Sequence, residues 1–398
     1  MKQISKEIVL RAETKQRQFL ENVIAGKESL ELLIMPNSKC NLGCTYCAPG
    51  GFLTAKLPYK RMPNEIIDKI LALAIDFKNR TNGLVNLEGH GFEPMLAGKD
   101  FFRNIGKKAK EADINFVIQT NATLIDKEWT KIFKTYDIGV GVSIDGPEDL
   151  HNATRPFHSG ADSYKAVLRG IKYLREADIP FGIISVLSKL HIKKDVSYWY
   201  DWLLENEFYS ADFHLPATSS NNAFFKTNKP SVNELTNFVL DLYDLWKTRS
   251  DGIVIRPFAL FSHSLIDGMP PSGACTLTSG CHRVVGFDFT GNIALCDSNV
   301  YSIGNIKDIG CLEELAAHPA MLASHMRPFL IAQNEESCKK CGYFDLCQGG
   351  CTHEAMIDTG DTYQKTKFCE VYKSLYSKIE TDLLELGKLP APREERTS

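Results

Sequence analysis

The segment 39–47 reads KCNLGCTYC and places three cysteines, Cys40, Cys44 and Cys47, in the spacing CxxxCxxC. Iron–sulfur clusters take cysteine thiolates as ligands, and a four-iron cluster that receives three thiolates keeps one iron open to a ligand that is not protein. Redox catalysis needs such an open position, whereas a structural metal site is closed. A zinc loop or a group of buried thiols is the alternative interpretation of this segment.

Alternating strands and helices are needed to position this loop. The apolar run 32–35 precedes it and predicts a buried strand. Six predicted strands alternate with helices, which favours parallel pairing with right-handed crossovers. Chemistry at the carboxyl ends of strands is typical of a barrel-type α/β domain, and a doubly wound sheet with the same periodicity is the alternative. The predicted strands cover 30–35, 84–87, 115–119, 138–144, 181–187 and 212–215, and the predicted helices cover 64–78, 99–112, 127–134, 163–177 and 194–205.

The cysteine spacing, with the aromatic Tyr46 just before its last cysteine, resembles the radical S-adenosylmethionine (SAM) superfamily. The resemblance extends to three later segments at predicted strand ends. GFEP at 91–94 is similar to the family's GGEP motif, and QTNA at 119–122 is similar to its QTNG segment. SIDGP at 143–147, followed by HNATR, is similar to its SxDGP block. Phe92 and Ala122 stand where the family has glycine, and these departures concern the backbone of the two loops.

The resemblance implies a role for each matching residue. The open iron would bind the amino and carboxylate groups of SAM, and Glu93 would hold the ammonium group. Ser143 and Arg155 would hold the carboxylate, for which a guanidinium fork is suited. Tyr46 would contact the adenine. Asn121 either helps to position the ligand or forms an Asx turn at the end of the strand.

Eight further cysteines form one array beyond residue 268, with the spacing C-x5-C-x14-C and then C-x2-C-x5-C-x3-C-x17-C. This array resembles the SPASM domain, a C-terminal extension of peptide-modifying radical SAM enzymes. Eight thiolates suffice for two fully ligated four-iron clusters, and a pair of zinc sites is the alternative. The resemblance implies Cys275, Cys281, Cys296 and Cys351 as ligands of a first auxiliary cluster, and Cys338, Cys341, Cys347 and Cys369 as ligands of a second.

Polar residues outside these sets are further candidates. Asp297 directly follows Cys296, and in anaerobic sulfatase-maturating enzymes an aspartate at this place is the proposed base. A carboxylate beside a cluster ligand could take a proton while the cluster takes an electron, and a solvent-facing Asp that caps a turn is the alternative. Cys311 lies outside the array and is predicted to be an ordinary buried thiol. The candidates for a substrate channel are Tyr59, His90, His214, Arg256 and His282.

The composition argues against several classes of protein. The 398 residues include 46 Lys and Arg against 49 Asp and Glu, so no basic footprint indicates nucleic acid or an anionic membrane as a partner. The N-terminus has no signal peptide, and no run approaches the roughly 18 apolar residues of a membrane span. The 12 cysteines fit reduced, metal-binding thiolates in the cytoplasm better than a secreted disulfide framework.

The predicted domain order starts with an N-terminal helix and a radical SAM barrel of the partial (β/α)6 TIM type, whose last residues, 222–230, form a linker. A linking helix and a SPASM domain with two auxiliary clusters follow, and the tail is predicted to be disordered after Lys388. The corresponding ranges are 1–29, 30–230, 231–267, 268–376 and 377–398.

The sequence therefore predicts a cytoplasmic radical SAM oxidoreductase with SAM and three [4Fe-4S] clusters as cofactors. A 5′-deoxyadenosyl radical from SAM would remove hydrogen from a residue of a precursor peptide or protein. The favoured product is an intramolecular crosslink in a ribosomal peptide (RiPP), either a carbon–carbon cyclophane or a thioether. Phe92, and APGG at 48–51 in place of an aromatic continuation, depart from sulfatase maturases and favour this product.

Three alternatives remain open at this stage. They are oxidation of Cys or Ser to formylglycine, dehydrogenation of a small alcohol, and a non-catalytic metal-binding scaffold. A flavodoxin or ferredoxin is the expected electron donor. Because no segment before the barrel is long enough for a leader-binding domain, leader recognition would fall to the barrel and SPASM surfaces or to a separate leader-binding protein.

Overall fold

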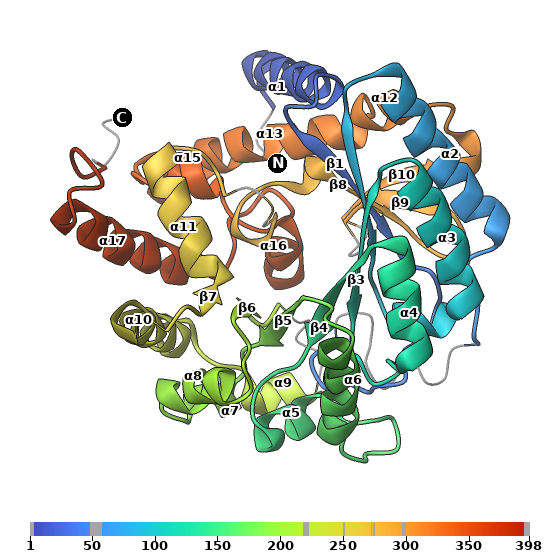
Figure 1. Ribbon diagram of the computed structural model, residues 1–398. Helices are drawn as coiled ribbons and strands as arrows, with labels where there is room; N and C mark the ends of the chain where they lie inside the picture. Colours follow the sequence, from blue (N-terminus) through green and yellow to red (C-terminus); the bar gives the residue numbers. More distant parts are fainter. Residues whose placement is uncertain are drawn as a thin grey trace. The chain divides into compact units, whose positions relative to one another are not determined.

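A computed structural model (Figure 1) describes residues 4–47, 58–217, 223–249, 251–271, 273, 275–296 and 300–393, except the side chains of 224–226 and 275. The residues group into two compact units. The first comprises Met1–Ile144, His151–Phe181 and Cys281–Met326, and the second comprises Asp145–Leu150, Gly182–Gly280 and Arg327–Ser398. The units interleave along the chain, so the domain boundaries inferred from the sequence stay predictions.

The first unit is built on one sheet. Its strands, in spatial order, are β10 (Tyr301–Asn305), β9 (Asn292–Leu295), β8 (Val284–Phe287), β1 (Ser29–Ile34), β2 (Leu84–Gly89), β3 (Asn115–Thr120) and β4 (Ile138–Ser143). Strands β8, β1, β2, β3 and β4 pair in parallel, whereas β9 is antiparallel to both β8 and β10. The carboxyl ends of β1–β4 therefore lie along the same edge of the sheet. Because β8 pairs with β1, part of the cysteine-rich region continues this sheet.

Helices of the first unit cover the sheet with apolar faces. Figure 1 shows α2, α3 and α4 next to one another along one side of strands β2–β4. Helix α3 buries Phe101, Phe102 and Ile105, and Phe102 stacks on Phe116 of β3. The helices and short 3-10 turns of this unit are α1 (Lys6–Ile24), α2 (Asn64–Arg80), η2 (Pro94–Ala97), α3 (Lys99–Glu111), α4 (Lys127–Tyr136), α6 (Tyr164–Glu176), η4 (Cys281–Arg283), η5 (Ile306–Asp308) and α12 (Leu312–Ala316).

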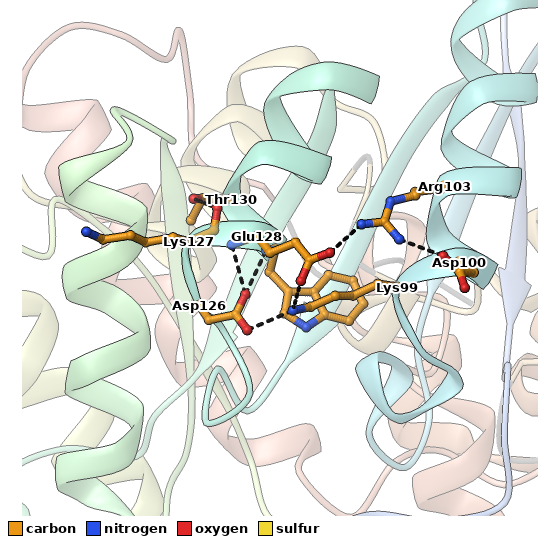
Figure 2. A network of polar contacts seen from close by, with 8 residues as sticks. Lys99, Asp100, Arg103, Asp126, Lys127, Glu128 and Thr130 are labelled. Atoms are coloured by element: carbon orange, nitrogen blue, oxygen red, sulfur yellow. Dashed lines mark hydrogen bonds and ion pairs between the residues drawn. The ribbon is translucent and has the colours of Figure 1, made fainter.

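The starts of α3 and α4 are joined by a charged network, which Figure 2 shows from close by. Lys99 lies 2.8 Å from Asp126 and 2.7 Å from Glu128, and Arg103 reaches Glu128 at 2.5 Å. Asp126 also caps α4 by accepting from the N–H groups of Glu128 and Trp129. Because these charged side chains are partly or fully exposed to solvent, each ion pair contributes little to stability.

The second unit holds three parallel strands and most of the remaining helices. Strand β5 pairs with β6, and β6 pairs with β7. Helix α17 packs against α10 and α11. Helices α5 (Glu148–Thr154) and α13 (Pro319–Asn334) have residues in both units, as does β5, whose first residue Phe181 belongs to the first. The elements of the second unit are β5 (Phe181–Val186), α7 (Lys189–Ile192), α8 (Val196–Glu205), β6 (Ser210–His214), α9 (Ala223–Asn228), α10 (Val232–Arg249), β7 (Val254–Ile255), α11 (Arg256–Asp267), η3 (Cys275–Leu277), α14 (Glu336–Lys339), α15 (Phe344–Cys347), α16 (Thr352–Thr359) and α17 (Cys369–Glu385).

The six predicted strands and the helices between them are confirmed, with ends that differ by a few residues. The predicted linker at 222–230 is wrong for 223–228, which form α9; this segment contains neither Gly nor Pro, and Pro230 comes only after its end. Disorder after Lys388 is also wrong as far as Arg393, which hydrogen-bonds to Glu380 and to the carbonyl of Gly342. Among the described helices, none is long and apolar enough to cross a membrane.

Candidate active site

The cysteine loop (residues 40–47) is held in place by the segment 154–158. The N–H groups of Gly43 and Thr45 each donate to a carbonyl of this segment at 2.8 Å. Nε2 of His158 lies 2.9 Å from a carbonyl oxygen of the loop. The loop follows β1, and these contacts fix a segment that has no regular secondary structure of its own.

The three thiols of the loop lie within electrostatic range of one another. Cys44 is buried, and Cys40 and Cys47 are half-buried. Burial raises the pKa of the Cys40 thiol, and the charges of Glu93, Cys44 and Cys47 raise it further. The N–H group of Leu42 lies 3.3 Å from Sγ of Cys40 and favours the thiolate. A bound metal would still deprotonate Cys40 despite burial and the nearby negative charges, because a coordinating thiol loses its proton outright.

These residues fit an iron–sulfur cluster. In the part of the chain that the structure describes, no three His, Cys, Asp or Glu side chains form a group that could hold a metal ion. The thiolates of a four-iron cluster bind different irons, so they need not converge on one point as the ligands of a tetrahedral zinc ion do. Three neighbouring thiols and a backbone N–H directed at one sulfur are the features that such a cluster would use.

Glu93 is fully buried beside this loop and begins η2. Its carboxylate accepts hydrogen bonds from the N–H of Met95 at 3.1 Å, the hydroxyl of Thr120 at 2.7 Å and the N–H of Asn121 at 2.8 Å. Burial raises the pKa of Glu93 to about 6, and the three hydrogen bonds oppose that rise. A carboxylate fixed in this way is suited to a cationic group such as an ammonium.

The two residues that replace family glycines keep a glycine-like backbone. Phe92 has φ 53° and Ala122 has φ 59°, in the left-handed region that side chains disfavour. The packing around Ala122 is close, since a Cβ added at Gly170 would lie 2.0 Å from its carbonyl oxygen. The two departures from the motifs therefore stand at positions whose backbone conformation favours glycine.

Asn121 braces the cysteine loop and also forms a turn. Its Nδ2 donates to Oδ1 of Asn41 at 2.8 Å and lies 3.8 Å from Sγ of Cys40. Its Oδ1 accepts from the N–H of Thr123 at 3.1 Å, which is an Asx turn. The alternative of an Asx turn is therefore present, and the same side chain links the end of β3 to the loop.

Tyr46 and Arg155 are brought together, and Ser143 lies at the end of β4. The guanidinium carbon of Arg155 is 5.3 Å from the centroid of the Tyr46 ring, and both residues are buried. This arrangement is a cation–π contact. The hydroxyl of Ser143 accepts from Nε2 of Gln119 at 2.9 Å. Gln119 had no predicted role, although it belongs to the segment that resembles QTNG.

Residues 34–195, which include all of these groups, match the family model described as the Radical SAM superfamily. The chain carries a radical SAM domain. Enzymes of this superfamily bind SAM and a 4Fe-4S cluster. The predicted enzyme class and the predicted α/β fold, a partial barrel with a cysteine-rich C-terminal region, are thereby confirmed.

The similarity extends beyond the radical SAM domain. The chain is 28% identical over 364 residues to the cysteine-type anaerobic sulfatase-maturating enzyme of Clostridium perfringens. The alignment covers 87% of this chain and 95% of that enzyme. The chain also resembles the structure of native anSMEcpe with bound AdoMet and the Cp18Cys peptide. The TM-score is 0.76 at 25% identity, and the superposition covers 90% of this chain and 98% of that one. The structure of Streptococcus suis SuiB bound to the precursor peptide SuiA shares the fold. Its TM-score is 0.62 at 20% identity, and the superposition covers 90% of this chain and 79% of that one.

Four cysteines of the C-terminal array lie near one another in the second unit. They are Cys338, Cys341, Cys347 and Cys369. The pKa of Cys347 is raised to about 12, mainly by burial and in addition by the charges of the other three cysteines. Burial likewise raises the pKa of Cys338 to about 11, with Cys369 and Cys341 as additional causes. The ligand set that the resemblance implies for the second auxiliary cluster is therefore grouped in space.

The other implied ligand set is only partly described. Cys281 and Cys296 belong to the first unit, and Cys351 belongs to the second. For Cys275 only the backbone, in η3, is described. The catalytic candidate Asp297 and residues 48–51 lie outside the described residues. Cys311 is half-buried at the start of α12 and not fully buried.

The channel candidates separate into different surroundings. The ring of His282 lies against that of His325 at a tilt of 31°, with 4.2 Å between the ring centroids, and the residue is half-buried. Tyr59 is exposed, with its hydroxyl 2.9 Å from the carbonyl of Leu96. Nδ1 of His90 lies 3.6 Å from the carboxylate of Glu88.

His214 and Arg256 meet at the carboxyl ends of β6 and β7. Nη1 of Arg256 lies 3.0 Å, and Nε2 of His214 lies 3.9 Å, from the same carboxylate oxygen of Asp212. Asp212 is 8% exposed. Sequence reasoning missed this carboxylate, although its position two residues before His214 puts both side chains on one face of the strand.

Proposed function

We propose that this chain oxidises the side chain of a Cys or Ser residue in a peptide or protein to formylglycine, as an anaerobic sulfatase-maturating enzyme. The alignment over 95% of the Clostridium perfringens enzyme carries this proposal. The similarity to anSMEcpe with AdoMet and a peptide supports it. The crosslinking prediction depended in part on Phe92, whose φ of 53° lies in the left-handed region that glycine adopts readily.

Bound SAM and its cluster would supply a 5′-deoxyadenosyl radical that takes a hydrogen atom from Cβ of the substrate residue, with a second cluster accepting the remaining electron. The first electron would come from a flavodoxin or ferredoxin. Glu93 would hold the ammonium group of SAM, and Arg155 and Ser143 would hold its carboxylate. Asp297 would take the proton that is lost as the carbon–sulfur or carbon–oxygen double bond forms. With a Cys substrate, water then replaces the sulfur and hydrogen sulfide leaves.

The test uses three peptides that differ only at the target position of a sulfatase sequence, which is Cys, Ser or Ala. The full-length protein is reconstituted anaerobically with iron and sulfide and given a reductant and SAM. We expect the Cys peptide to lose sulfur and to gain an aldehyde that a hydrazide reagent captures. The Ser peptide should lose two hydrogen atoms and gain the same aldehyde, and the Ala peptide should stay unchanged.

Other products would overturn the proposal and identify the alternatives. A Cys peptide that loses two hydrogen atoms, keeps its sulfur and gains no aldehyde would be crosslinked. Oxidation of a small alcohol without peptide would indicate a dehydrogenase. If no 5′-deoxyadenosine forms with any reductant, the protein is a scaffold.

Asp297→Asn tests the proposed base. This variant should still form 5′-deoxyadenosine but should yield much less formylglycine, because the amide cannot take the proton. Asp308→Asn, at an exposed aspartate, is the control and should turn over normally. If Asp297→Asn makes product at the parent's rate, another group is the base.

A further inference from the structure

Arg327 is a fully buried cation in α13, and all five of its N–H donors are used. Nε donates to the carbonyl of Thr362 at 2.6 Å. Nη1 donates to the hydroxyl of Ser279 at 2.9 Å and to the carbonyl of Gly350 at 2.7 Å. Nη2 donates to the carbonyls of Gly349 at 3.3 Å and Gln364 at 2.7 Å. One guanidinium therefore joins three separate segments of the second unit.

The segment 348–350 is the one most shaped by this contact. Gln348, Gly349 and Gly350 have φ values of 51°, 90° and 70°, so three successive residues are left-handed. A Cβ at Gly349 would lie 2.4 Å from the side chain of Ile331, and one at Gly350 would lie 2.4 Å from that of Thr366. This turn presents two carbonyl groups to Arg327, and it is the whole connection between Cys347 and Cys351.

The charge of Arg327 needs compensation at this depth, because an uncompensated buried cation is costly. Five neutral acceptors stabilise the cation, but they do not cancel its charge. The buried carboxyl group of Glu354 supplies part of the compensating charge. Burial raises the pKa of Glu354 to about 7, and the positive charge of Arg327 partly offsets this rise. A four-iron cluster held by four thiolates is anionic, so its charge would complement the guanidinium. The guanidinium thus fits an anionic cluster held by the four cysteines of the second unit, of which Cys347 adjoins the turn.

We propose that Arg327 is a positioning residue for the auxiliary clusters. Its hydrogen bonds to Gly349 and Gly350 hold the turn that follows Cys347, and so keep this thiol beside Cys338, Cys341 and Cys369. Its positive charge raises the reduction potential of the cluster bound by Cys338, Cys341, Cys347 and Cys369, because it stabilises the added electron. This inference rests on the proposed clusters and not on the identity of the peptide product.

The experiment separates these clusters from the one in the cysteine loop. In a background with Cys40, Cys44 and Cys47 all changed to Ala, the bound iron and the spectroscopic signals come from auxiliary clusters alone. Arg327→Met and Arg327→Lys are compared with this parent after anaerobic reconstitution. The readouts are the rate of iron loss to a chelator and the reduction potential from a titration followed by electron paramagnetic resonance. No peptide is used, so a failed product assay does not affect the result.

Arg327→Met should lose iron about 10 to 100 times faster, the range for removal of an outer-shell partner, and its remaining cluster should have a more negative potential. Arg327→Lys should also lose iron faster, because it has three donors in place of five, but it should keep the parent's potential. An Arg327→Met protein with the parent's iron retention or the parent's potential would overturn the proposal. If that variant does not fold, unchanged iron loss in Arg327→Lys would overturn it.

Discussion

The two cysteine-rich regions described above have opposite surroundings. Hydrogen-bonding side chains lie beside the cysteine loop: Nδ2 of Asn121 is 3.8 Å from Sγ of Cys40, and the charge of Glu93 acts on the same thiol. In the second unit, Cys338 is part of an apolar cluster with Ile331 and Phe344. Polar surroundings suit a cluster that must also bind a charged ligand, whereas apolar surroundings suit one that is enclosed and transfers electrons.

Each region also contains a buried glutamate whose pKa is raised. Glu93 accepts three hydrogen bonds, and its pKa is raised to about 6. Glu354 accepts a hydrogen bond from Thr366, and its pKa is raised to about 7. Burial is the leading cause in both cases, and additional donors keep Glu93 the more acidic group. At neutral pH the first region thus keeps its carboxylate largely ionised, while Glu354 in the second is about half ionised.

The largest expected effect is complete loss of one reaction step when a single cysteine of one region is replaced. Cys44→Ala should abolish SAM cleavage, because the proposed cluster that delivers the electron loses a ligand. Cys347→Ala should retain SAM cleavage and lose the peptide product. Liquid chromatography of 5′-deoxyadenosine and mass spectrometry of the peptide measure both. Equal loss of 5′-deoxyadenosine in the two variants would mean that the regions do not have separate functions.

Glu93→Gln should weaken SAM binding. A hydrogen bond to a charged group contributes about 1.5–3 kcal/mol, so the dissociation constant should rise about 10 to 100-fold. Glu354→Gln is the matched control, since it removes a buried carboxylate from the other region, and it should leave SAM affinity unchanged. Equilibrium dialysis of labelled SAM against the reconstituted proteins gives both constants. Unchanged affinity in Glu93→Gln would remove this residue from the SAM site.

The pH dependence of stability should report the same carboxylates. The folded protein raises the pKa of Glu93 from 4.5 to about 6, so it holds the proton more tightly than the unfolded chain. The raised pKa of Glu93 therefore adds about 2 kcal/mol to the free energy of unfolding below about pH 4.5. This stabilisation is lost as the pH rises through about 6. Urea unfolding of the metal-free protein across this range measures the slope. Glu93→Gln should flatten it, and a parent slope in that variant would contradict the assignment.

The sequence predicted the parts of both regions that depend on local spacing. The cysteine spacings located the thiols, and alternating apolar runs located the strands that precede Glu93 and Asn121. The segment 223–228 was misread because its polar residues were taken as a linker signal, although it contains no residue that breaks a helix. Short helices without a long apolar face give little periodicity to recognise.

The groups that hold the chemistry in place were not predicted. Thr120 reaches Glu93 across 27 positions, and Arg327 reaches Ser279 across 48. Such contacts depend on which elements meet in the fold, and local propensity does not encode that. The available signal for Arg327 is a lone charged residue among apolar ones in 319–334, which suggests a buried cation but does not name its partners.

The smallest expected effect tests whether the strained turns of the two regions differ. Ala122→Gly should change the free energy of unfolding by less than about 1 kcal/mol, because relief at φ 59° offsets the usual cost of glycine. The control Ala166→Gly, within helix α6, should lower stability by about 1 kcal/mol. In the other region, Gly350→Ala should lower stability by about 1–3 kcal/mol, since its Cβ would lie 2.4 Å from Thr366. Chemical unfolding of the three metal-free variants measures these differences. If Ala122→Gly and Ala166→Gly lower the free energy of unfolding equally, the turn after β3 does not favour glycine.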